Sequence, residues 1–364
     1  MISAFALIDA VMDKKILIVT NMGPKPSAPF QGQFVKNQVD ALSDLQPAYC
    51  YMRWHNDSLL NRLLKYPVLW LQFFGRFVLS RTTYDLIHVH YFYPTIWLAL
   101  TYRWLRNPKV KIVVTCHGSD IYFYQPASAW YKFAAKAVDY WIFTSEKLKE
   151  RFFNQQVANI VLPAGIHPVF GNAQQKSRSE KTFDLLYVGT LDHNKGMDRL
   201  LALLPTLFAA MPALTIAVIG HGSYRSQLAA AALLYPGLQL FSPKSPAELQ
   251  HYYQDSRGFL SLSRNESFGL VMTEAMACYT PVIATATDGS QAQINHGETG
   301  FMLSQQDEVQ LQQQLLDTIQ LLLTMPAPDY LQLQLAGRQN AEHYLVSQVA
   351  GQLQRLYQSL LDVE

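Results

Sequence analysis

Short apolar runs alternate with helical stretches along almost the whole chain, and this alternation restricts the possible fold more than any other feature. A run such as residues 15–20, Lys-Ile-Leu-Ile-Val-Thr, is too uniformly apolar for a strand with one face in water. Strands buried on both faces belong to parallel sheets, in which helices make the crossover connections. The sequence therefore predicts an α/β fold. In the first half the predicted strands are 15–20, 85–90, 111–116, 140–144 and 159–162, and the predicted helices include 34–45 and 129–138.

The alternation is interrupted once and then begins again. Residues 171–180, Gly-Asn-Ala-Gln-Gln-Lys-Ser-Arg-Ser-Glu, have the polar, turn-rich character of a linker between domains. A chain of 364 residues is also long for a single core, which favours two domains. In the second half the predicted strands are 184–188, 214–219, 238–241, 258–262 and 281–284, and the predicted helices are 197–208, 224–234, 246–254 and 270–278.

These patterns give a division of the chain into three parts. We expect an N-terminal Rossmann-like domain over residues 1–168 and a second Rossmann-like domain over residues 169–345. Residues 346–364 are expected to form a C-terminal helix that packs back on the N-terminal domain. The Gln-rich stretch 305–320 has Leu at helical spacing and predicts an amphipathic surface helix. Ligands of such sheets bind at the carboxyl ends of the strands.

Composition excludes several classes of protein. Hydrophobic residues make up 49% of the chain and charged residues 15%, which argues against disorder, and a net charge of +2 does not predict nucleic-acid binding. The three cysteines, Cys50, Cys116 and Cys278, form no Cys-x-x-Cys motif. A disulfide framework or zinc site is therefore not expected, and a reducing cytoplasm fits best.

The N-terminus lacks the basic region of a signal peptide, since Asp9 and Asp13 precede the first Lys. We interpret the residues before Met12 as an extension, with Met12 as an alternative start. No apolar run reaches the roughly 18 residues that a spanning helix needs. Residues 59–81 mix Trp70 and three Phe with four Arg or Lys. This mixture is typical either of a buried helix or of a helix on an anionic membrane surface.

The segment from Ser263 to Ala277 carries the clearest chemical signal. It places Glu266 before Phe268-Gly269-Leu270, and Glu274 inside a helix-forming stretch. A helix N-terminus offers backbone N–H groups and a positive dipole end to an anion, and carboxylates accept hydrogen bonds from hydroxyls. This order suits a diphosphate-linked sugar. The alternative is a pair of ordinary solvated carboxylates.

This segment resembles the E-x7-E motif of the family 4 glycosyltransferases, which are retaining enzymes of the GT-B fold. His117-Gly118-Ser119-Asp120 is similar to the family's H-G-x-D motif, and Tyr187-Val188-Gly189 with Lys195-Gly196 is similar to its first phosphate-binding stretch. The loop within residues 21–38 resembles that of members that build bacterial surface polysaccharides. The resemblance implies two Rossmann-like β/α/β domains that face each other across a cleft.

The resemblance also implies roles for the second domain. Glu266 would contact the donor sugar and Glu274 the ribose of the nucleotide, while the backbone amides of Phe268, Gly269 and Leu270 would approach the sugar and the diphosphate. Lys195 would neutralise charge on the leaving phosphate, a form of transition-state stabilisation. Thr190 lies in the donor site where many members have Arg, which keeps open a catalytically silent protein that only binds a nucleotide sugar. Taken alone, Lys195 could be an exposed loop lysine.

In the first domain the resemblance points to three residues. Gly32 would let the backbone approach the donor closely, although an ordinary turn glycine remains an alternative. His117 would hydrogen-bond the donor sugar beside the reacting centre, and Asp120 would contact the acceptor. His88 and His90 share one face of a strand, and we interpret both as structural. Tyr279, Ala164 and His167 depart from the family's usual residues.

The expected reaction is transfer of a sugar from a nucleotide diphosphate sugar to a hydroxyl, with retention of configuration. The resemblance implies attack and departure on the same face of the sugar, helped by the donor's own phosphate oxygen. The resemblance implies catalytic roles for His117, Lys195 and Glu266. No cofactor and no metal are expected, since the chain contains no Asp-x-Asp. The acceptor is expected to be lipid-linked, the location cytoplasmic at the inner face of the membrane, and the pathway surface polysaccharide or glycolipid assembly.

A nicotinamide enzyme is the remaining alternative. The loop Gly220-His221-Gly222-Ser223-Tyr224-Arg225 follows a predicted strand but has Arg225 at the place of the third glycine of a dinucleotide fingerprint. A strand-to-helix turn is the simpler interpretation of this loop.

Overall fold

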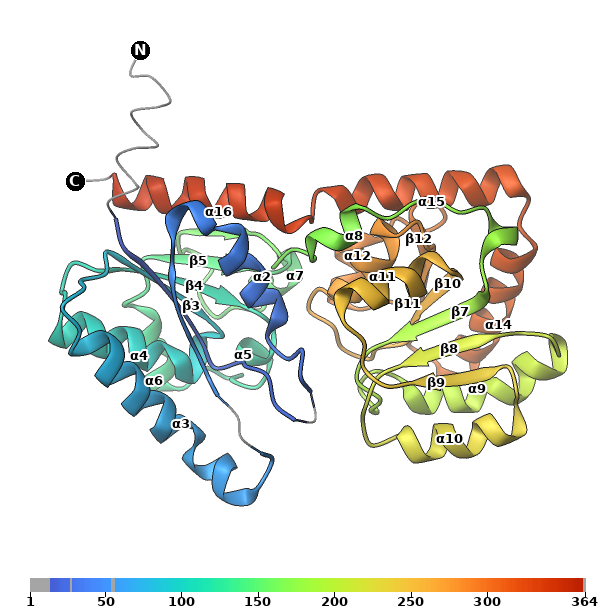
Figure 1. The fold of residues 1–364 in the computed structure, drawn as a ribbon, viewed down its shortest axis with the longest axis horizontal. Helices are drawn as coiled ribbons and strands as arrows, with labels where there is room; N and C mark the ends of the chain where they lie inside the picture. The colour runs from blue at the N-terminus through green and yellow to red at the C-terminus, as the bar shows by residue number, and fades with distance from the viewer. Residues whose placement is uncertain (1–13, 27, 54–55, 363–364) are drawn as a thin grey trace, which may run out of the picture. The chain divides into compact units, whose positions relative to one another are not determined.

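The computed structural model describes residues 14–26, 28–53 and 56–362, and the expected extension before Met12 lies outside them. The described residues form two compact units (Figure 1). The first comprises the chain up to Gly165 together with the segment that begins at Val346, and the second is Ile166–Leu345. The domain boundary expected after residue 168 lies three residues beyond this division.

The first unit is built on a six-stranded parallel sheet of order β2-β1-β3-β4-β5-β6. The strands are β1 (Ile16–Thr20), β2 (Ala48–Tyr51), β3 (Leu86–His90), β4 (Lys111–Cys116), β5 (Tyr140–Phe143) and β6 (Asn159–Val161). The helices are α2 (Gln33–Ala41), α3 (Leu59–Phe73), α4 (Phe92–Leu105), α5 (Ser119–Tyr122), α6 (Ala129–Ala135), α7 (Glu146–Glu150) and α16 (Val346–Leu361), with a π-helical turn over Phe74–Val78.

Both faces of this sheet are covered, as the apolar strands predict. Leu17 and Val19 of β1 contribute to a core formed with α3, α4, α6 and α7, whereas Ile16 and Ile18 contribute to a core formed with α2 and α16. α16 therefore packs on the first sheet although it ends the chain. Its Tyr357 is fully buried, and the Tyr357 hydroxyl lies 2.5 Å from Nδ1 of His88 in β3.

The second unit repeats the architecture with sheet order β12-β11-β10-β7-β8-β9, again all parallel. Its strands are β7 (Phe183–Val188), β8 (Ile216–Ile219), β9 (Leu238–Phe241), β10 (Ser256–Ser261), β11 (Val282–Thr285) and β12 (Gly300–Leu303). Its helices are α8 (Pro168–Gly171), α9 (Met197–Ala210), α10 (Arg225–Leu234), α11 (Pro246–Gln254), α12 (Leu270–Ala277), α13 (Asp288–Gln293), α14 (Glu308–Thr324) and α15 (Ala327–Glu342). The α/β prediction is confirmed in both units.

Three expectations need correction. The segment 171–180 is not a linker, because it packs within the second unit, where Lys176 pairs with Asp255 and Arg178 Nη1 donates to the Met325 carbonyl. The helix expected over 34–45 ends at Ala41 and is followed by a separate 3-10 turn, Ser43–Leu45. Two strands, β2 and β12, were not predicted. The Gln-rich helix is confirmed as α14, whose buried side is Leu311, Leu315, Ile319 and Leu322.

Among the described helices, none combines the length and the apolarity that crossing a bilayer requires.

Candidate functional site

The strand order of the second sheet creates a natural ligand position beside β7. After β7 the chain proceeds to β8 and β9 on one side, and then returns to β10 on the other side of β7. In open α/β sheets ligands bind beside the carboxyl ends of the strands at such a switch point, which here is the place of the loops that follow β7 and β10. These two loops contain the residues that the sequence marked in this unit, from Thr190 to Gly196 and from Glu266 to Gly269.

The loop after β7 is held in a fixed shape by hydrogen bonds between side chains and backbone groups. The Tyr187 hydroxyl donates to the Thr190 carbonyl at 2.8 Å, and the Lys195 amide donates to Oδ1 of Asp192 at 2.9 Å. Gly196 has a left-handed φ of 75° where α9 begins, and a Cβ placed there would lie 2.2 Å from the Leu262 carbonyl oxygen. Gly196 thus lets the loop after β7 pass against the end of β10. Thr190 is exposed.

Lys195 and Glu266 meet in an ion pair that joins the two loops. Their side chains are 26% and 17% exposed, so both can be reached from solvent. A dianionic diphosphate would compete with Glu266 for the Lys195 ammonium, whereas sugar hydroxyls would compete for the Glu266 carboxylate. The pair can therefore exchange one internal contact for two contacts with a phosphate-linked sugar.

α12 begins immediately behind this pair. Gly269, at φ 82°, precedes the helix, and a Cβ there would lie 2.8 Å from Cγ of Glu266. The loop backbone is fixed from the other side, since the Gly289 amide donates to the Glu266 carbonyl at 2.8 Å and Gln293 Nε2 donates to the Phe268 carbonyl. The prediction that Glu266 lies in a loop and Glu274 in the first turns of a helix is confirmed.

Glu274 occupies a drier environment than Glu266. It is partly buried on α12, and its Oε2 accepts a 2.9 Å hydrogen bond from the hydroxyl of Tyr253 on α11, itself fully buried. Burial raises the pKa of Glu274 to about 7, although the Tyr253 hydrogen bond opposes the shift. A further hydroxyl donor at this carboxylate would favour its charged form.

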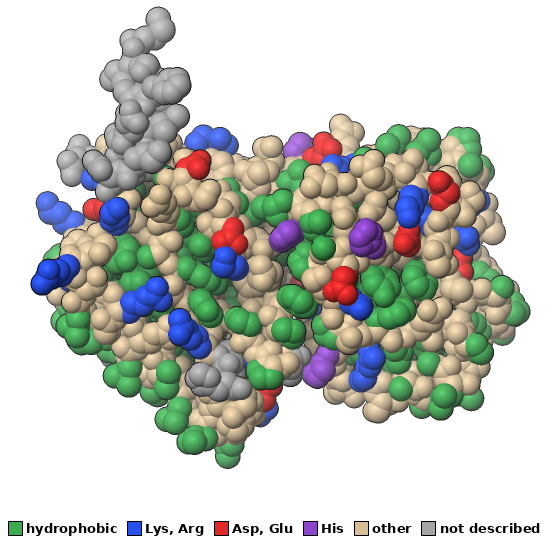
Figure 2. Space-filling model, in the orientation of Figure 1, with side chains coloured by type: hydrophobic (Ala, Val, Ile, Leu, Met, Phe, Trp, Pro, Cys, Tyr) green, Lys and Arg blue, Asp and Glu red, His purple; other side chains and the backbone are tan. Residues whose placement is uncertain are grey.

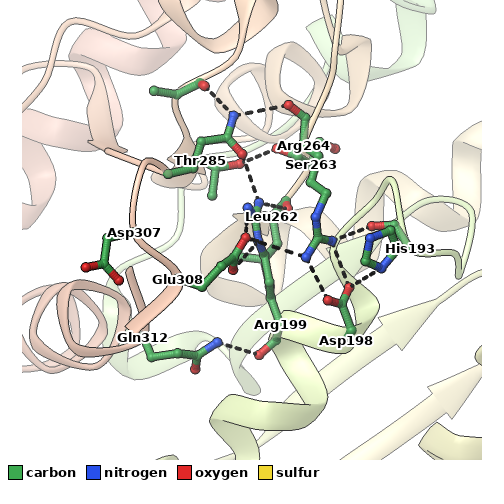
Figure 3. Close-up of polar contacts among 12 residues, drawn as sticks. His193, Asp198, Arg199, Leu262, Ser263, Arg264, Thr285, Asp307, Glu308 and Gln312 are labelled. Atoms are coloured by element: carbon green, nitrogen blue, oxygen red, sulfur yellow. Dashed lines mark hydrogen bonds and ion pairs between the residues drawn. The ribbon is translucent and has the colours of Figure 1, made fainter. Parts of the chain in front are cut away.

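A network of charged groups supports the loop after β10 (Figure 3). Arg264 forms hydrogen bonds of 2.8 and 2.7 Å with the two carboxylate oxygens of Asp198, and its amide donates to the Asn194 carbonyl at 2.7 Å. Arg199, which is 3% exposed, donates to the Leu262 carbonyl at 3.0 Å and to Glu308 on α14. The network ties α9, α14 and the end of β10 together, and so fixes the backbone that carries Glu266.

The first unit has its own switch point, between β1 and β3. Gly32, at φ 80°, ends the loop after β1, and a Cβ there would lie 3.2 Å from the backbone of Met22. Gly32, Pro24, Lys36 and Tyr51 are among the residues that line a small pocket of about 150 Å3. Phe34, two residues further along, has its ring centroid 5.0 Å from that of His117. Gly32 and His117 therefore lie at the same edge of the first sheet.

His117 follows β4 and is enclosed by other rings. Its Nε2 lies 3.0 Å from Nδ1 of His90 at the end of β3, and the Tyr91 ring centroid is 4.6 Å away. Burial lowers the pKa of His117 to about 3 and the pKa of His90 well below its ordinary value. Both imidazoles are therefore neutral near pH 7. A neutral imidazole can donate or accept one hydrogen bond at each nitrogen, but it supplies no charge.

Asp120 is 2% exposed, and its carboxylate faces the loop backbone. Oδ1 accepts from the amides of His117 and Gly118, both at 3.0 Å, and Oδ2 accepts from the amide of Phe92 at 2.9 Å. Burial raises the pKa of Asp120 in spite of these three bonds. The contacts favour a supporting part for Asp120 beneath His117. The contact with an acceptor stays a prediction.

Contacts also describe the surroundings of His88 and His90 in the first unit and of the Gly220 loop in the second. His88 is structural, as expected, because its ring nitrogens contact Tyr357 and the Thr115 hydroxyl. His90 is buried and contacts His117, and its structural interpretation stays a prediction. Arg225 Nη1 donates to the carbonyls of Gly220 and Phe241, at 3.2 and 2.7 Å, and so closes the Gly220 loop against the sheet. Within the described residues, no three His, Cys, Asp or Glu side chains are grouped closely enough to hold a metal ion.

Sequence reasoning missed the supporting residues Arg264, Asp198, Gln293 and Tyr253. Arg264 stands two positions before Glu266, and that proximity was the one local signal available. Asp198, Gln293 and Tyr253 come from distant segments, and nothing in the local pattern marks them. The sequence marked the candidate residues for ligand binding, and the fold supplies the residues that hold them in place.

Comparison with known proteins agrees with this geometry. A family model described as glycosyl transferases group 1 matches residues 170–340, and one described as glycosyltransferase family 4 matches residues 43–170. D-inositol 3-phosphate glycosyltransferases of Frankia alni and Corynebacterium urealyticum are 34% and 33% identical to this chain over 154 and 184 residues, or 39% and 48% of it. The matched parts span only 37% and 42% of those relatives.

Solved structures extend the likeness of fold to nearly the whole chain. A sucrose-phosphate synthase from Thermosynechococcus elongatus superposes with a TM-score of 0.75 at 21% identity, over 96% of this chain and all of that one. HepE of Anabaena, solved in complex with UDP, gives a TM-score of 0.72 at 15% identity, over 95% of this chain and all of that one.

Proposed function

Since this chain belongs to family 4 of the glycosyltransferases, with the GT-B fold, we propose that it transfers a hexose from a nucleotide diphosphate sugar to a hydroxyl acceptor, with retention of configuration. The observation that carries the proposal is the Lys195–Glu266 ion pair in front of α12. It brings a cation, a carboxylate and a helix N-terminus together at the carboxyl ends of β7 and β10. A cation and a helix N-terminus suit the phosphates of a phosphate-linked sugar, and a carboxylate suits its hydroxyls.

The proposed chemistry assigns each group one task. As the glycosidic bond breaks, negative charge grows on the leaving phosphate, and the Lys195 ammonium and the backbone amides of Phe268, Gly269 and Leu270 stabilise it. Glu266 accepts hydrogen bonds from the sugar hydroxyls, and Glu274 accepts from the ribose. His117, as a neutral imidazole, hydrogen-bonds the sugar. Because Lys195 supplies the positive charge, the proposed reaction is independent of metal and of any cofactor.

We place the acceptor hydroxyl on the same face of the sugar as the departing phosphate. A phosphate oxygen of the donor then takes the acceptor proton, so that no residue of the chain need act as general base. Gly32, Thr190 and Asp120 keep their expected parts, the first two beside the donor and Asp120 beside the acceptor.

We further propose a lipid-linked acceptor and a part in surface polysaccharide or glycolipid assembly, at the inner face of the membrane. Support comes from the exposed leucines of α3 and from the free, buried thiols of Cys50, Cys116 and Cys278, which fit a reducing compartment. The two relatives compared above carry an inositol phosphate in their names, so inositol phosphate is the competing acceptor to test.

The test begins with the donor. Thermal-shift and calorimetric titration with UDP, GDP, ADP and their sugars should identify one base by a clear stabilisation, which Glu274→Ala reduces. Incubation with that donor and either a lipid-linked or an inositol acceptor should then release nucleoside diphosphate, and NMR of the product should show the donor's anomeric configuration. Binding without turnover across a broad acceptor panel would leave the silent-protein alternative. Binding of none of these nucleotides would refute the donor site itself.

A further inference from the structure

α3 has an apolar surface on the side that faces away from its own core. Leu69 and Phe73 face inward and are buried, whereas seven other large hydrophobic side chains of the same helix are exposed. These seven are Leu59, Leu60, Leu63, Leu64, Val68, Trp70 and Leu71, which are between 40% and 74% exposed. Most of them recur at helical spacing and form one stripe. Exposed apolar patches of this kind mark interaction surfaces in soluble proteins.

The patch continues from α3 onto α4 and α6, which lie beside it in Figure 1. The ring centroid of Trp97 in α4 lies 6.3 Å from that of Trp104, at the end of α4, and 6.3 Å from that of Trp130 in α6. The ring centroid of Trp130 lies 6.3 Å from that of Phe133. Trp104, Trp130 and Phe133 are more than half exposed. Figure 2 shows hydrophobic side chains gathered along the edge that α3 occupies in Figure 1. We name this surface, from α3 to α6, the aromatic face.

A cavity of about 240 Å3 opens in the aromatic face, between α3 and α4. Its walls include Tyr66 and Trp70 from α3 and Thr95 and Trp97 from α4. The other lining residues are Leu69, Pro94 and Leu98, so the wall is mainly apolar, although it includes the buried Thr95 hydroxyl, which has no hydrogen-bond partner among the described residues. A mainly apolar cavity of this size suits a hydrocarbon chain better than a strongly polar ligand.

Exposed cations predominate in the stretch of chain that carries the aromatic face, although Asp57 and Asp139 flank it. Between Ser58 and Val138, every residue of which is described, seven cations are exposed: Arg62, Arg76, Arg81, Arg106, Lys109, Lys132 and Lys136. The two acidic residues of that stretch are Asp85, which is partly buried, and Asp120, which is buried. The first unit has 19 Lys and Arg against 12 Asp and Glu, while the second has 10 against 15. The net charge of +2 for the whole chain hides this difference.

We infer that the aromatic face docks on an anionic lipid bilayer and that the cavity between α3 and α4 takes up one hydrocarbon chain from it. Leucines and tryptophans that enter the interface, ringed by cations that meet anionic headgroups, are the arrangement that holds a protein on such a surface. Two copies of this chain would instead bring like charges together, which disfavours self-association through the same face.

The cavity borders the edge of the first sheet where the acceptor is expected. Asn21, the residue after β1, donates from Nδ2 to the Tyr66 hydroxyl at 3.3 Å, and Thr95 lies in the first turn of the helix that follows β3. A lipid held by its chain in this cavity would thus present its headgroup close to Gly32 and His117. The inference rests on the proposed function only for this last step, the identification of that lipid with the acceptor.

Vesicle flotation without any donor tests the docking. The full chain should bind vesicles of phosphatidylcholine with 30% phosphatidylglycerol and should bind pure phosphatidylcholine at least tenfold more weakly, with the difference reduced in 0.5 M salt. The double substitution Leu63→Glu/Leu71→Glu should lower binding at least tenfold. Leu233→Glu/Leu234→Glu, at exposed leucines of α10, is the matched control and should leave binding unchanged.

Fluorescence quenching tests the cavity. Vesicle lipids brominated on their chains should quench tryptophan emission on binding, and Trp70→Phe/Trp97→Phe should remove more of that quenching than Trp141→Phe, which changes a core residue. Equal quenching in the two variants would overturn the cavity assignment. Vesicle binding that is insensitive to Leu63→Glu/Leu71→Glu would overturn the docking surface. Self-association that this double substitution abolishes, with no vesicle binding, would assign the face to a second copy instead.

These outcomes are separable from those for the proposed function. A chain that binds vesicles but turns over no donor leaves the docking surface standing and refutes only the enzyme. A chain that glycosylates a water-soluble acceptor but ignores vesicles refutes the docking surface and the lipid-linked acceptor, and leaves the proposed sugar transfer standing.

Discussion

Glu274 offers the sharpest test of the donor site, because its environment links nucleotide binding to pH. Burial raises the pKa of this carboxyl from an ordinary value of 4.5 to about 7. In the proposed complex the ribose hydroxyls donate to the same carboxylate and favour its charged form. Donor binding should therefore release a proton in the interval between these two pKa values, and acid should weaken binding.

The size of the effect follows from the shift. If the bound carboxyl titrates near 4.5, the free protein at pH 5.5 is almost wholly protonated at Glu274 and must lose that proton to bind. The affinity should then fall roughly 25-fold between pH 8 and pH 5.5, which corresponds to about 2 kcal/mol. Above pH 8 the affinity should be level, since Glu274 is charged in both states.

Calorimetry can measure this directly. The ligand should be the intact nucleotide sugar, because the terminal phosphate of a free nucleoside diphosphate titrates near pH 6 and would add a pH dependence of its own. Titrations in buffers of different ionisation enthalpy report the number of protons released. Glu274→Gln should bind more weakly at pH 8 and show a nearly flat pH profile, whereas Glu298→Gln, at an exposed carboxylate of the same unit, should retain the slope. An unchanged slope in Glu274→Gln would refute the role of this carboxylate.

Four further outcomes are expected. Lys195→Met should lower kcat by about 100-fold and change donor affinity much less, because the charge that Lys195 stabilises grows mainly in the transition state; turnover equal to that of the parent would contradict this role. Gly196→Ala should lower the free energy of unfolding by more than about 2 kcal/mol in a denaturant titration, since its Cβ meets the Leu262 carbonyl. Gly297→Ala is the control, because Gly297 has a similar φ of 81° and its Cβ would have nothing within 4 Å. This control should cost only about 1 kcal/mol of backbone strain. His90→Leu should lower kcat about tenfold with little change in donor KM, and His90→Asn should recover part of the loss, because an amide can replace the ring nitrogen that contacts His117; no loss in His90→Leu would count against a positioning part. Without ligand, Glu274→Gln should raise the free energy of unfolding by up to about 3 kcal/mol above pH 7 and leave it unchanged below pH 4.5. The reason is that the raised pKa makes the folded state less stable only where Glu274 must ionise. A gain in the free energy of unfolding that is the same at all pH values would contradict the raised pKa.

The sequence reveals the central strands of each sheet and also the edge strands β6 and β9. β1, β3 and β4 are buried on both faces and are apolar at almost every position. Two other edge strands, β2 and β12, were missed. Each has only four residues and no Val or Ile: β2 is Ala-Tyr-Cys-Tyr, with three partly buried positions, and β12 is Gly-Phe-Met-Leu, which begins with Gly300. Four residues of this composition leave too weak a pattern to predict a strand.

The false linker shows the opposite limit. Lys176 and Arg178 read as solvated loop residues, but their charges are used by Asp255 and by the Met325 carbonyl, which lie far along the chain. The site divides in the same way. The order Glu266, Gly269, Glu274 is local and could be interpreted from sequence, whereas the Tyr253 hydroxyl, which with burial sets the behaviour of Glu274, comes from another helix. Tertiary partners of this kind leave no local trace.

The position of α16 constrains how the chain can be made. Because the first unit is completed by Val346–Leu361, its second core layer stays open until this segment leaves the ribosome, while all residues of the second unit are already available. The unit encoded later can therefore finish folding earlier. A stop codon at Val346 would leave the second unit whole and strip the first sheet of Leu353 and Tyr357.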